Sequence, residues 1–381
     1  CVREIRARPA QLNMAAVTMV SNTASDEGLR RGLTRWHALA VVVGGVLGVG
    51  IYIRPASIAQ LVGSPSLIMT VWIGTGLLSL AGVLTYAELA ARIPRSGGEY
   101  AFLRVTMGEL PGFLFGWMRL TVGASSVAAQ AIAVTLFLSD LIPVAPAWAH
   151  IGIPWRPQPI LIDLGPRQLI AVLVIAGLAV LNIRGVGKAG RFQSWVTTIK
   201  VLGVLGLISV VAIVGHAHSA TTAVTQSVSP SPIGPSVFSA AVLAAVVVYN
   251  GWTNVAMVGG EVQDPGRNLP WALVLGMLIV IGLYVAVNIA YLHVLPIEDI
   301  LTANSTAHPT APSVAARAAV AALGPRAGFV LPLLFMISAL GALHCNILAV
   351  PRVFFSMARD GLLPQGLARA SSTSHTPAAA I

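Results

Sequence analysis

Long apolar stretches, separated by short polar segments, run through most of this chain and predict a bundle of membrane-spanning helices. Eight of the stretches come near the ~20 residues that a helix needs to cross a bilayer. They are Trp36–Val62, Leu67–Ala91, Pro111–Leu141, Gln168–Ile183, Trp195–Val214, Val237–Gly259, Trp271–Val294 and Phe329–Ala349. The first stretch is too long for a signal peptide, and further spans follow it. The pattern therefore predicts an all-α integral membrane protein.

Glycines interrupt two of these stretches near the depth of the bilayer midplane. The first interruption is Gly48-Val49-Gly50, and the second, in the sixth stretch, is Asn250-Gly251-Trp252. Glycine breaks helices because it loses the most backbone entropy on ordering and has no side chain to pack. An unwound turn leaves peptide groups unpaired, which the membrane interior allows only beside protein or a water-filled cavity. Matching interruptions in two halves indicate the binding site of a secondary transporter, although glycines also permit close helix packing.

The polar segments divide the chain into a tail and a membrane domain. Residues 1–35 are predicted to be a disordered N-terminal tail, and residues 36–381 a membrane transporter domain. Within that domain we expect a first repeat over residues 36–214 and an incomplete second repeat over residues 237–381. The segment 216–236, rich in Pro, Ser and Thr, is expected to be an external loop.

Composition supports a membrane protein and argues against a nucleic-acid partner. Charged residues make up 9% and hydrophobic residues 56% of the 381 positions, and the mean hydropathy is +0.82. A soluble domain averages about 25% charged residues. The net charge is +10, but the basic residues are scattered singly rather than gathered in a stripe. Sixteen Arg and Lys residues fall on the N-terminal side of the predicted bilayer and five on the other, which predicts a cell-membrane protein with a cytoplasmic N-terminus.

No pattern in the chain indicates a metal, a cofactor or an enzyme. The two cysteines, Cys1 and Cys345, lie outside any metal-ligand spacing. Residues 185–190 formally match GxGxxG, but no acidic residue follows within about 20 positions, as a dinucleotide site requires. Neither HExxH nor GxSxG occurs. We therefore predict no cofactor, no metal site and no catalytic residues.

Several motifs together carry a resemblance to a known family. They are Gly48–Pro55, Tyr86–Leu89, Ile93–Tyr100, Tyr249–Trp252, Glu261–Pro270, Arg352, Ala358–Gly361 and Leu363-Pro364. From about residue 34 to its end, the chain resembles the amino acid–polyamine–organocation superfamily, most closely its heterodimeric-transporter-like (L-type) amino acid permeases. The resemblance implies a broken-helix, inverted-repeat (leucine-transporter-type) core in which helices 1 and 6 are discontinuous. It also expects a ninth helix to begin where this chain ends, so the chain is expected to be C-terminally truncated.

A carrier of this kind is expected to bind its substrate between the two interruptions. The unwound first helix would offer backbone N–H groups and a positive dipole end to a carboxylate, while free carbonyls would hold an ammonium group. The substrate-binding residues that we predict are Val46, Leu47, Gly48, Val49, Gly50, Ile51, Val247, Asn250, Gly251, Trp252 and Thr253. Two departures from the family matter: Val49 replaces a common serine, and Val247 stands where a gating aromatic residue is common, which predicts a roomier site.

Lys200 lies within the fifth apolar stretch, where a charged side chain costs roughly 2.5–3.5 kcal/mol and is normally partnered. The resemblance implies that this lysine takes the place of a sodium ion between helices 1 and 8, and Ser338 on helix 8 is expected to assist it. The alternative is that Lys200 extends to the inner membrane surface, since Arg191 is only about two helical turns away.

These features predict secondary active transport of amino acids by alternating access, without sodium. A polyamine or organic-cation carrier of the same fold is the nearest alternative, although no carboxylate faces the predicted pocket to bind a second ammonium group. A non-transporting membrane scaffold or sensor is a further alternative because of the expected truncation. The predicted partners are an amino acid substrate and the lipid bilayer, and the sequence leaves open whether an accessory subunit exists.

Overall fold

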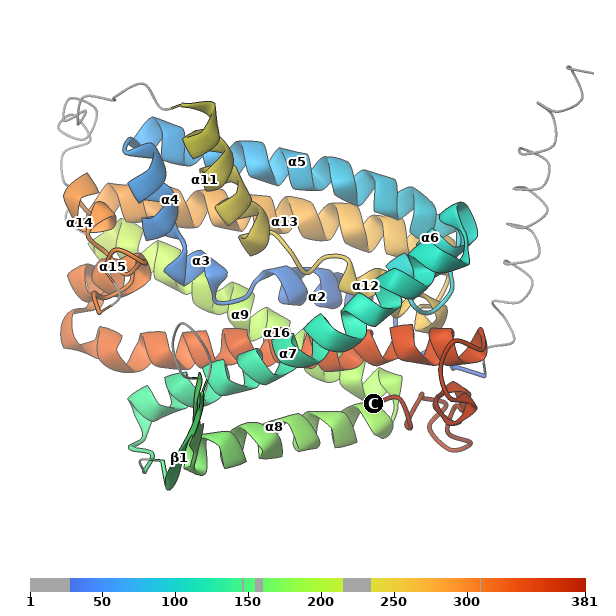
Figure 1. Ribbon diagram of the computed structural model, residues 1–381. Helices are drawn as coiled ribbons and strands as arrows, with labels where there is room; N and C mark the ends of the chain where they lie inside the picture. Colours follow the sequence, from blue (N-terminus) through green and yellow to red (C-terminus); the bar gives the residue numbers. More distant parts are fainter. Residues whose placement is uncertain (1–27, 146, 155–159, 215–233, 309) are drawn as a thin grey trace, which may run out of the picture.

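The computed structural model describes residues 28–145, 147–154, 160–214, 234–308 and 310–381, and most of them lie in long helices (Figure 1). In this part of the chain, seven helical segments are long and apolar enough to cross a membrane. They are Arg35–Ile53, α5 (Pro65–Arg92), α7 (Glu109–Leu141), α8 (Pro166–Ile183), α9 (Val186–Val214), α13 (Pro265–Val294) and a segment that ends with α16 (Ala327–Arg359). The shorter apolar helix α11 (Pro235–Val248) lies beside them.

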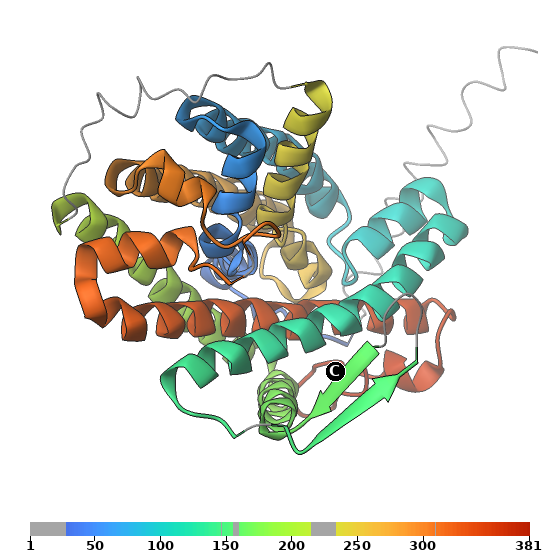
Figure 2. The same cartoon turned by 60° about the vertical axis from the view of Figure 1, so that its left-hand side comes forward.

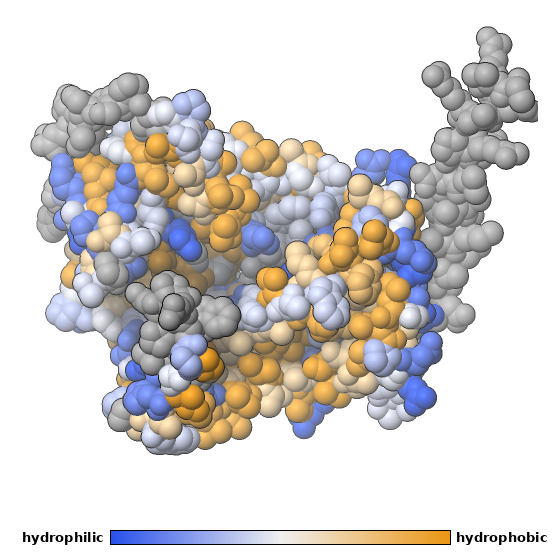
Figure 3. Space-filling model, in the orientation of Figure 1, coloured by the Kyte–Doolittle hydropathy of each residue, from blue (hydrophilic) through white to orange (hydrophobic). Residues whose placement is uncertain are grey.

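The long helices run side by side, with their connections gathered at the two ends of the bundle (Figures 1 and 2). One end carries α14 (Ile297–Leu301), α15 (Val314–Leu323) and η3 (Gly324–Arg326). The other end carries α6 (Glu99–Met107) and the C-terminal segment with η4 (Gln365–Ala368). Apolar residues dominate the flank seen in Figure 3, and hydrophilic residues gather toward the ends. Exposed side chains such as Leu173 (61%) and Trp195 (70%) have hydrocarbon rather than water as their natural surroundings.

The first predicted span consists of three helical pieces. α2 (Arg35–Val46) begins with a capping box, in which the Thr34 hydroxyl accepts from the His37 N–H. α3 (Gly50–Ile53) follows the interruption, and α4 (Pro55–Val62) continues it because Arg54 keeps a right-handed helical conformation. α2 lies at the centre of the bundle, in contact with α9, α13 and α16.

The sixth predicted span is also divided. α11 ends at Val248, and α12 (Asn254–Met257) and η2 (Gly259–Glu261) follow after a turn over residues 249–253. Gly251 in this turn has a φ of 120°, a conformation that side-chain-bearing residues rarely adopt. The α-helical hydrogen-bond pattern therefore stops close to the glycines in both spans.

Most predicted boundaries lie within two residues of those in the structure, and three differ by more. α9 begins at Val186 rather than Trp195, and α13 begins at Pro265 rather than Trp271. α16 continues to Arg359, ten residues beyond the predicted end at Ala349. In all three cases the helix continues past the apolar stretch into a segment with polar residues.

The prediction of an all-α protein was wrong in one place. Strands β1 (Ala149–Ile153) and β2 (Ile160–Leu164) form an antiparallel pair between α7 and α8, in a register that sets Ile151 opposite Ile162. Alternating isoleucines favour such a hairpin, since β-branched side chains pack well on a pleated surface. The protein is therefore mostly helical, with one small hairpin.

The predicted disordered tail does not extend to residue 35. Leu33 is fully buried and forms a parallel bridge with Val262, in which the Leu33 N–H donates to the Glu261 carbonyl at 2.9 Å. The Gln263 N–H donates to the Leu33 carbonyl, also at 2.9 Å. The start of the first span is thus tied to the end of the sixth. Residues 1–27, and residues 216–233 of the predicted external loop, lie outside the described residues.

Candidate functional site

The interruptions of the first and sixth spans meet in the middle of the bundle. A Cβ atom added to Gly45 would lie 2.8 Å from the Gly251 carbonyl oxygen, and one added to Gly251 would collide with the backbone of Gly45. No other residue type fits at either position, because the two backbones touch. The sequence predicted Gly251 as part of the site; Gly45, one turn before the first interruption, was not in the predicted set.

At the first interruption, the carbonyl end of α2 lies next to the N–H end of the helical segment that follows it. The N–H groups of Leu47 and Gly48 donate to the carbonyls of Val43 and Val46, which closes the end of α2. After it, the N–H groups of Val49, Gly50 and Ile51 stand at the start of the helical segment α3–α4. Groups at such a position have no carbonyl of an earlier turn to bind, and the helix dipole adds about half a positive charge there.

A tyrosine joins the carbonyls on the two sides of the site. The Tyr284 hydroxyl of α13 lies 2.8 Å from the Val46 oxygen and 3.3 Å from the Val248 oxygen, so it bridges the last residues of α2 and α11. The Val46 carbonyl also accepts from the Gly48 N–H, so both lone pairs of the Val46 oxygen are in use. Sequence reasoning missed Tyr284. The feature that could have revealed Tyr284 is its hydroxyl within an apolar span. A buried tyrosine O–H usually needs a hydrogen-bond partner.

The structure places the other predicted residues of the first interruption as follows. Val46, Leu47 and Ile51 are buried, while Gly48, Val49 and Gly50 are partly exposed. Val49 packs against the apolar cluster formed by α7, α8 and α16. At the interruption the two glycines therefore offer backbone groups only, while the Val49 side chain lies against that cluster.

In the sixth span, Val248 faces the first interruption rather than Val247. A Cβ atom on Gly50 would lie 3.1 Å from a methyl group of Val248, whereas the Val247 side chain is 59% exposed. Asn250 is also exposed. A helix rotates successive side chains by about 100°, so Val247 and Val248 lie on different faces of α11.

Trp252 and Thr253 contact different side chains. The Trp252 ring packs edge-on against Tyr86 of α5 at a centroid distance of 4.8 Å. Thr253 is instead a hydrogen-bond neighbour of the Glu99 side chain, at the start of α6. One residue thus turns toward α5, and the other toward a buried carboxyl group that the sequence analysis did not single out.

Lys200 is fully buried, and its ammonium group donates to the Gly44 carbonyl at 2.8 Å. It lies against α16 as well, since a Cβ atom on Gly341 would be 2.9 Å from its Nζ. The side chain therefore points to the end of α2 and not to the membrane surface. The expected help from Ser338 is not seen: its buried hydroxyl lies beside Tyr52, and Lys200 is bonded to the Gly44 carbonyl instead.

Side chains from several helices hold the carbonyls of α2. Thr197 of α9 donates to the Ala40 carbonyl at 3.0 Å, next to the bond from Lys200. Cys345 of α16 donates to the Val41 carbonyl at 3.5 Å and accepts from Asn254 of α12 at 3.4 Å. The first and sixth spans are thus linked through one thiol. Cys345 is a buried residue with a free thiol.

Two buried charged clusters lie on the side of the interruptions toward α6. In the first, burial raises the pKa of the Glu99 carboxyl, while the Arg119 guanidinium and the Thr253 hydroxyl oppose that rise. One Glu99 oxygen and the Arg119 Nε have no hydrogen-bond partner in the described chain. In the second, Arg352 of α16 forms a bidentate ion pair with Glu261 of η2, at 2.7 and 3.2 Å.

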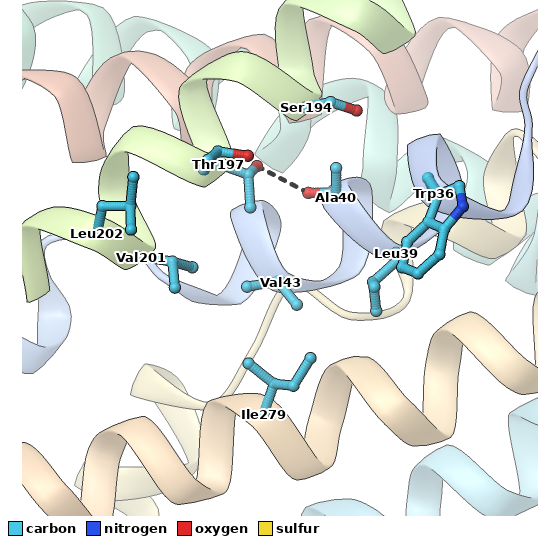
Figure 4. A pocket seen from close by; sticks show the side chains of 10 residues that line it. Trp36, Leu39, Ala40, Val43, Ser194, Thr197, Val201, Leu202 and Ile279 are labelled. Atoms are coloured by element: carbon cyan, nitrogen blue, oxygen red, sulfur yellow. Dashed lines mark hydrogen bonds between the residues drawn. The ribbon is translucent and has the colours of Figure 1, made fainter. Parts of the chain in front are cut away.

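A cavity of about 290 Å³ lies beside α2 but outside the meeting point of the interruptions (Figure 4). It is lined mainly by apolar side chains of α2, α9 and α13, among them Leu39, Val201 and Ile279. Thr197 reaches its wall but is already bonded to Ala40. This cavity offers few polar groups to an amino acid. Nor do the described residues include a group of three or more His, Cys, Asp or Glu side chains able to hold a metal ion.

Comparison with known proteins decides the family. The model of the family described as amino acid permease matches residues 33–381. The chain belongs to this family. It is 31% identical to the serine/threonine exchanger SteT of Bacillus subtilis, over 89% of this chain and 70% of that protein. It is also 31% identical to the large neutral amino acids transporter small subunit 2 of Oryctolagus cuniculus, over 95% of this chain and 64% of that protein.

A third relative is also a transporter by name. The human cystine/glutamate transporter is 28% identical over 93% of this chain and 66% of its own length. The chain thus spans between 64% and 70% of the length of these three relatives. Membership of a permease family with such relatives confirms the predicted family resemblance, and it confirms that the chain is classed with multi-pass membrane transporters and not with enzymes.

Proposed function

We propose that this protein is a secondary transporter of amino acids whose substrate binds where the two interrupted spans meet. The observation that carries the proposal is the backbone contact between Gly45 and Gly251, beside the Tyr284 bridge. This contact brings a helix start and two helix ends to one point at the centre of an apolar bundle. All three relatives named above are transporters or exchangers of amino acids by name.

Each end of an amino acid has a chemical counterpart at this point. The N–H groups at Val49, Gly50 and Ile51 suit the carboxylate, because they combine donors with a positive dipole end. The Val46 carbonyl is already used twice, so we assign the ammonium group to the carbonyls of Leu47 and Asn250. Since Val49 replaces the serine, the carboxylate is held here by backbone donors alone.

Lys200 serves in this proposal as a built-in cation that makes sodium unnecessary. Its ammonium group is bonded to Gly44, in the last turns of α2, where a carbonyl end attracts positive charge. A fixed ammonium holds the end of α2 as a bound sodium ion would. Lys200 therefore acts as a positioning residue and does not itself touch the substrate.

Alternating access, the inverted repeat and the membrane orientation complete the proposal. The inner pieces of both spans are joined to each other by the Leu33–Val262 bridge, so they can move as one unit against α7 and α16. We place the first repeat at residues 36–214, part of a second at residues 237–381, and the N-terminus in the cytoplasm of a cell.

The proposal is tested by exchange in proteoliposomes that contain the purified chain. Vesicles are loaded with unlabelled amino acids, and uptake of a labelled panel is measured in sodium chloride and in choline chloride. We expect exchange of at least one amino acid at equal rates in both salts, with putrescine unable to compete. No exchange of any amino acid would refute the proposed function, and exchange of putrescine alone would replace it by a cation carrier.

A substitution pair tests the role of Lys200. Lys200→Met removes the ammonium group at similar volume, and we expect exchange to fall at least tenfold while the amount of folded protein is kept. Ile199→Met is the control, because the Ile199 side chain is 46% exposed on the outer surface of the same helix. Full exchange in Lys200→Met would show that the ammonium group is dispensable, without bearing on amino acid transport by the wild type.

A further inference from the structure

A strongly basic cavity of about 450 Å³ opens at the end of the bundle that carries α6 and the C-terminal segment, away from the interruptions. Six basic or titratable side chains line it: Arg30, Arg31, His37, Arg184, Lys188 and Arg191. The other described residues that line it are neutral, so none of them contributes an acidic side chain to its wall. None of the five Arg and Lys residues forms an ion pair within the described part of the chain.

Without a bound anion, the clustered positive charges of this cavity destabilise the folded protein. Like charges gathered around one hollow repel each other, and a concave wall of one sign focuses the field and concentrates counter-ions. Arginine presents paired N–H donors whose spacing matches the oxygens of a phosphate group. The charge and shape of the wall therefore favour an anion that carries several negative charges close together.

Backbone donors add a second, independent feature at the same wall. The turn between α8 and α9 contributes Gly185, Val186 and Gly187, and α9 is a 29-residue helix that begins at Val186. The N–H groups of Lys188 and Ala189 are used by the Gly185 carbonyl. The N–H groups of Val186 and Gly187 precede them, at the positive end of the α9 dipole. An added Cβ atom on Gly185 would meet open space, so a ligand can approach this backbone closely.

We propose that this cavity is a binding site for a polyanion with clustered phosphate groups, either a free organic phosphate or the headgroup of an anionic lipid. A volume of about 450 Å³ suits such a headgroup, since small-molecule pockets commonly measure about 300–1,000 Å³. The transported amino acid is a poor candidate, because its single carboxylate would leave most of the positive charge unbalanced. The residues matching GxGxxG acquire a role here that needs no dinucleotide fold.

The cavity wall joins parts of the chain that the proposed transport cycle would separate. Arg30 and Arg31 precede Leu33, which is bridged to Val262, and Gln263 reaches the wall directly. The opposite side of the wall belongs to the turn that joins α8 to α9. A bound polyanion would therefore tie the start of the first span and the end of the sixth to this turn. Binding should stabilise the arrangement seen here against thermal unfolding.

The first arm of the test uses a soluble probe. Inositol hexakisphosphate is titrated into purified protein in a neutral detergent, and both its dissociation constant and the thermal midpoint are measured. Lys188→Gln/Arg191→Gln removes two cations from the wall, whereas the control Arg267→Gln/Arg369→Gln removes two exposed cations outside it. We expect the cavity variant to bind at least about tenfold more weakly, the control to bind as wild type, and added salt to weaken binding.

The second arm distinguishes the source of the phosphate groups. The same variants are placed in nanodiscs of phosphatidylcholine with or without phosphatidylinositol bisphosphate, and the thermal midpoint is compared. Stabilisation by the lipid that is lost only in the cavity variant assigns the site to a headgroup; stabilisation by the soluble probe alone assigns it to a free phosphate. Equal behaviour of cavity variant and control in both arms would overturn the proposal, and neither arm depends on transport.

Discussion

The buried ion pair between Glu261 and Arg352 predicts that replacing either residue destabilises the protein, with a different pH dependence in each case. Both side chains are fully buried, and the pair joins η2, at the end of the interrupted sixth span, to α16. Removing one partner of such a pair strands the other charge, which costs about 3–5 kcal/mol of unfolding free energy. The two single substitutions should nevertheless respond differently to pH, because only one of the stranded groups can lose its charge.

In Arg352→Met, the remaining carboxylate can take up a proton. Protonating an ordinary glutamate at pH 7 costs about 3.7 kcal/mol, since each unit between pH and an ordinary pKa of about 4.3 is about 1.36 kcal/mol. The loss of unfolding free energy caused by the stranded carboxylate cannot exceed this protonation cost, because the group can be protonated instead. At pH 5 the same limit is about 1 kcal/mol. In Glu261→Gln, the remaining guanidinium stays charged at every accessible pH, so no such relief exists.

Denaturant unfolding in mixed micelles measures these differences at pH 5 and pH 7, each variant against wild type at the same pH. We expect Arg352→Met to recover at least 2 kcal/mol at pH 5 relative to pH 7, and Glu261→Gln to recover less than about 0.5 kcal/mol. The double variant should be more stable than either single variant at pH 7. A cost of Arg352→Met that does not depend on pH, or a double variant whose loss is the sum of both singles, would refute the reasoning.

Two further predictions concern Glu99 and Gly251. Burial raises the folded-state pKa of Glu99, so its contribution to stability is present at low pH and lost as pH rises above the ordinary glutamate value. Glu99→Gln should therefore raise the thermal midpoint at pH 7.5, with the gain shrinking toward pH 4.5; exposed Glu88→Gln should show no such trend, and a loss at pH 7.5 would contradict the argument. Gly251→Ala should lower the thermal midpoint by several degrees and abolish exchange, because its φ of 120° and its contact with Gly45 both exclude a Cβ atom. Gly177→Ala, in α8 with open space around the added atom, should behave as wild type, and equal effects of the two would disprove the close approach.

The apolar pattern was sufficient to predict most of the helices. Each of the eight apolar stretches contains one long helix or a set of shorter pieces, because burying a run of about 20 apolar residues in hydrocarbon forces internal hydrogen bonding. The glycine segments were predicted to interrupt the first and sixth spans, and helices end beside both. These are local properties, which depend on residue type and spacing alone.

The charge of Lys200 was also informative by itself. A lone lysine within a span needs a partner, and the resemblance placed Lys200 between helices 1 and 8. The structure gives the partner as Gly44 and leaves out Ser338. Sequence reasoning could find the need for a contact, because desolvation of a charge is costly wherever it occurs. It could not choose among acceptors that several helices bring within reach.

The remaining features depend on how the helices are rotated and packed against each other. The apolar pattern does not set the phase of α11, so the choice between Val247 and Val248 was left to packing. The Tyr284 bridge joins carbonyls from two helices, and the basic cavity gathers residues from four segments that are far apart in the chain. Hydrophobic burial determines that these helices lie in a membrane, because it depends only on apolar area. Their pairing depends on side-chain shape and buried hydrogen bonds, which exist only once the tertiary structure has formed.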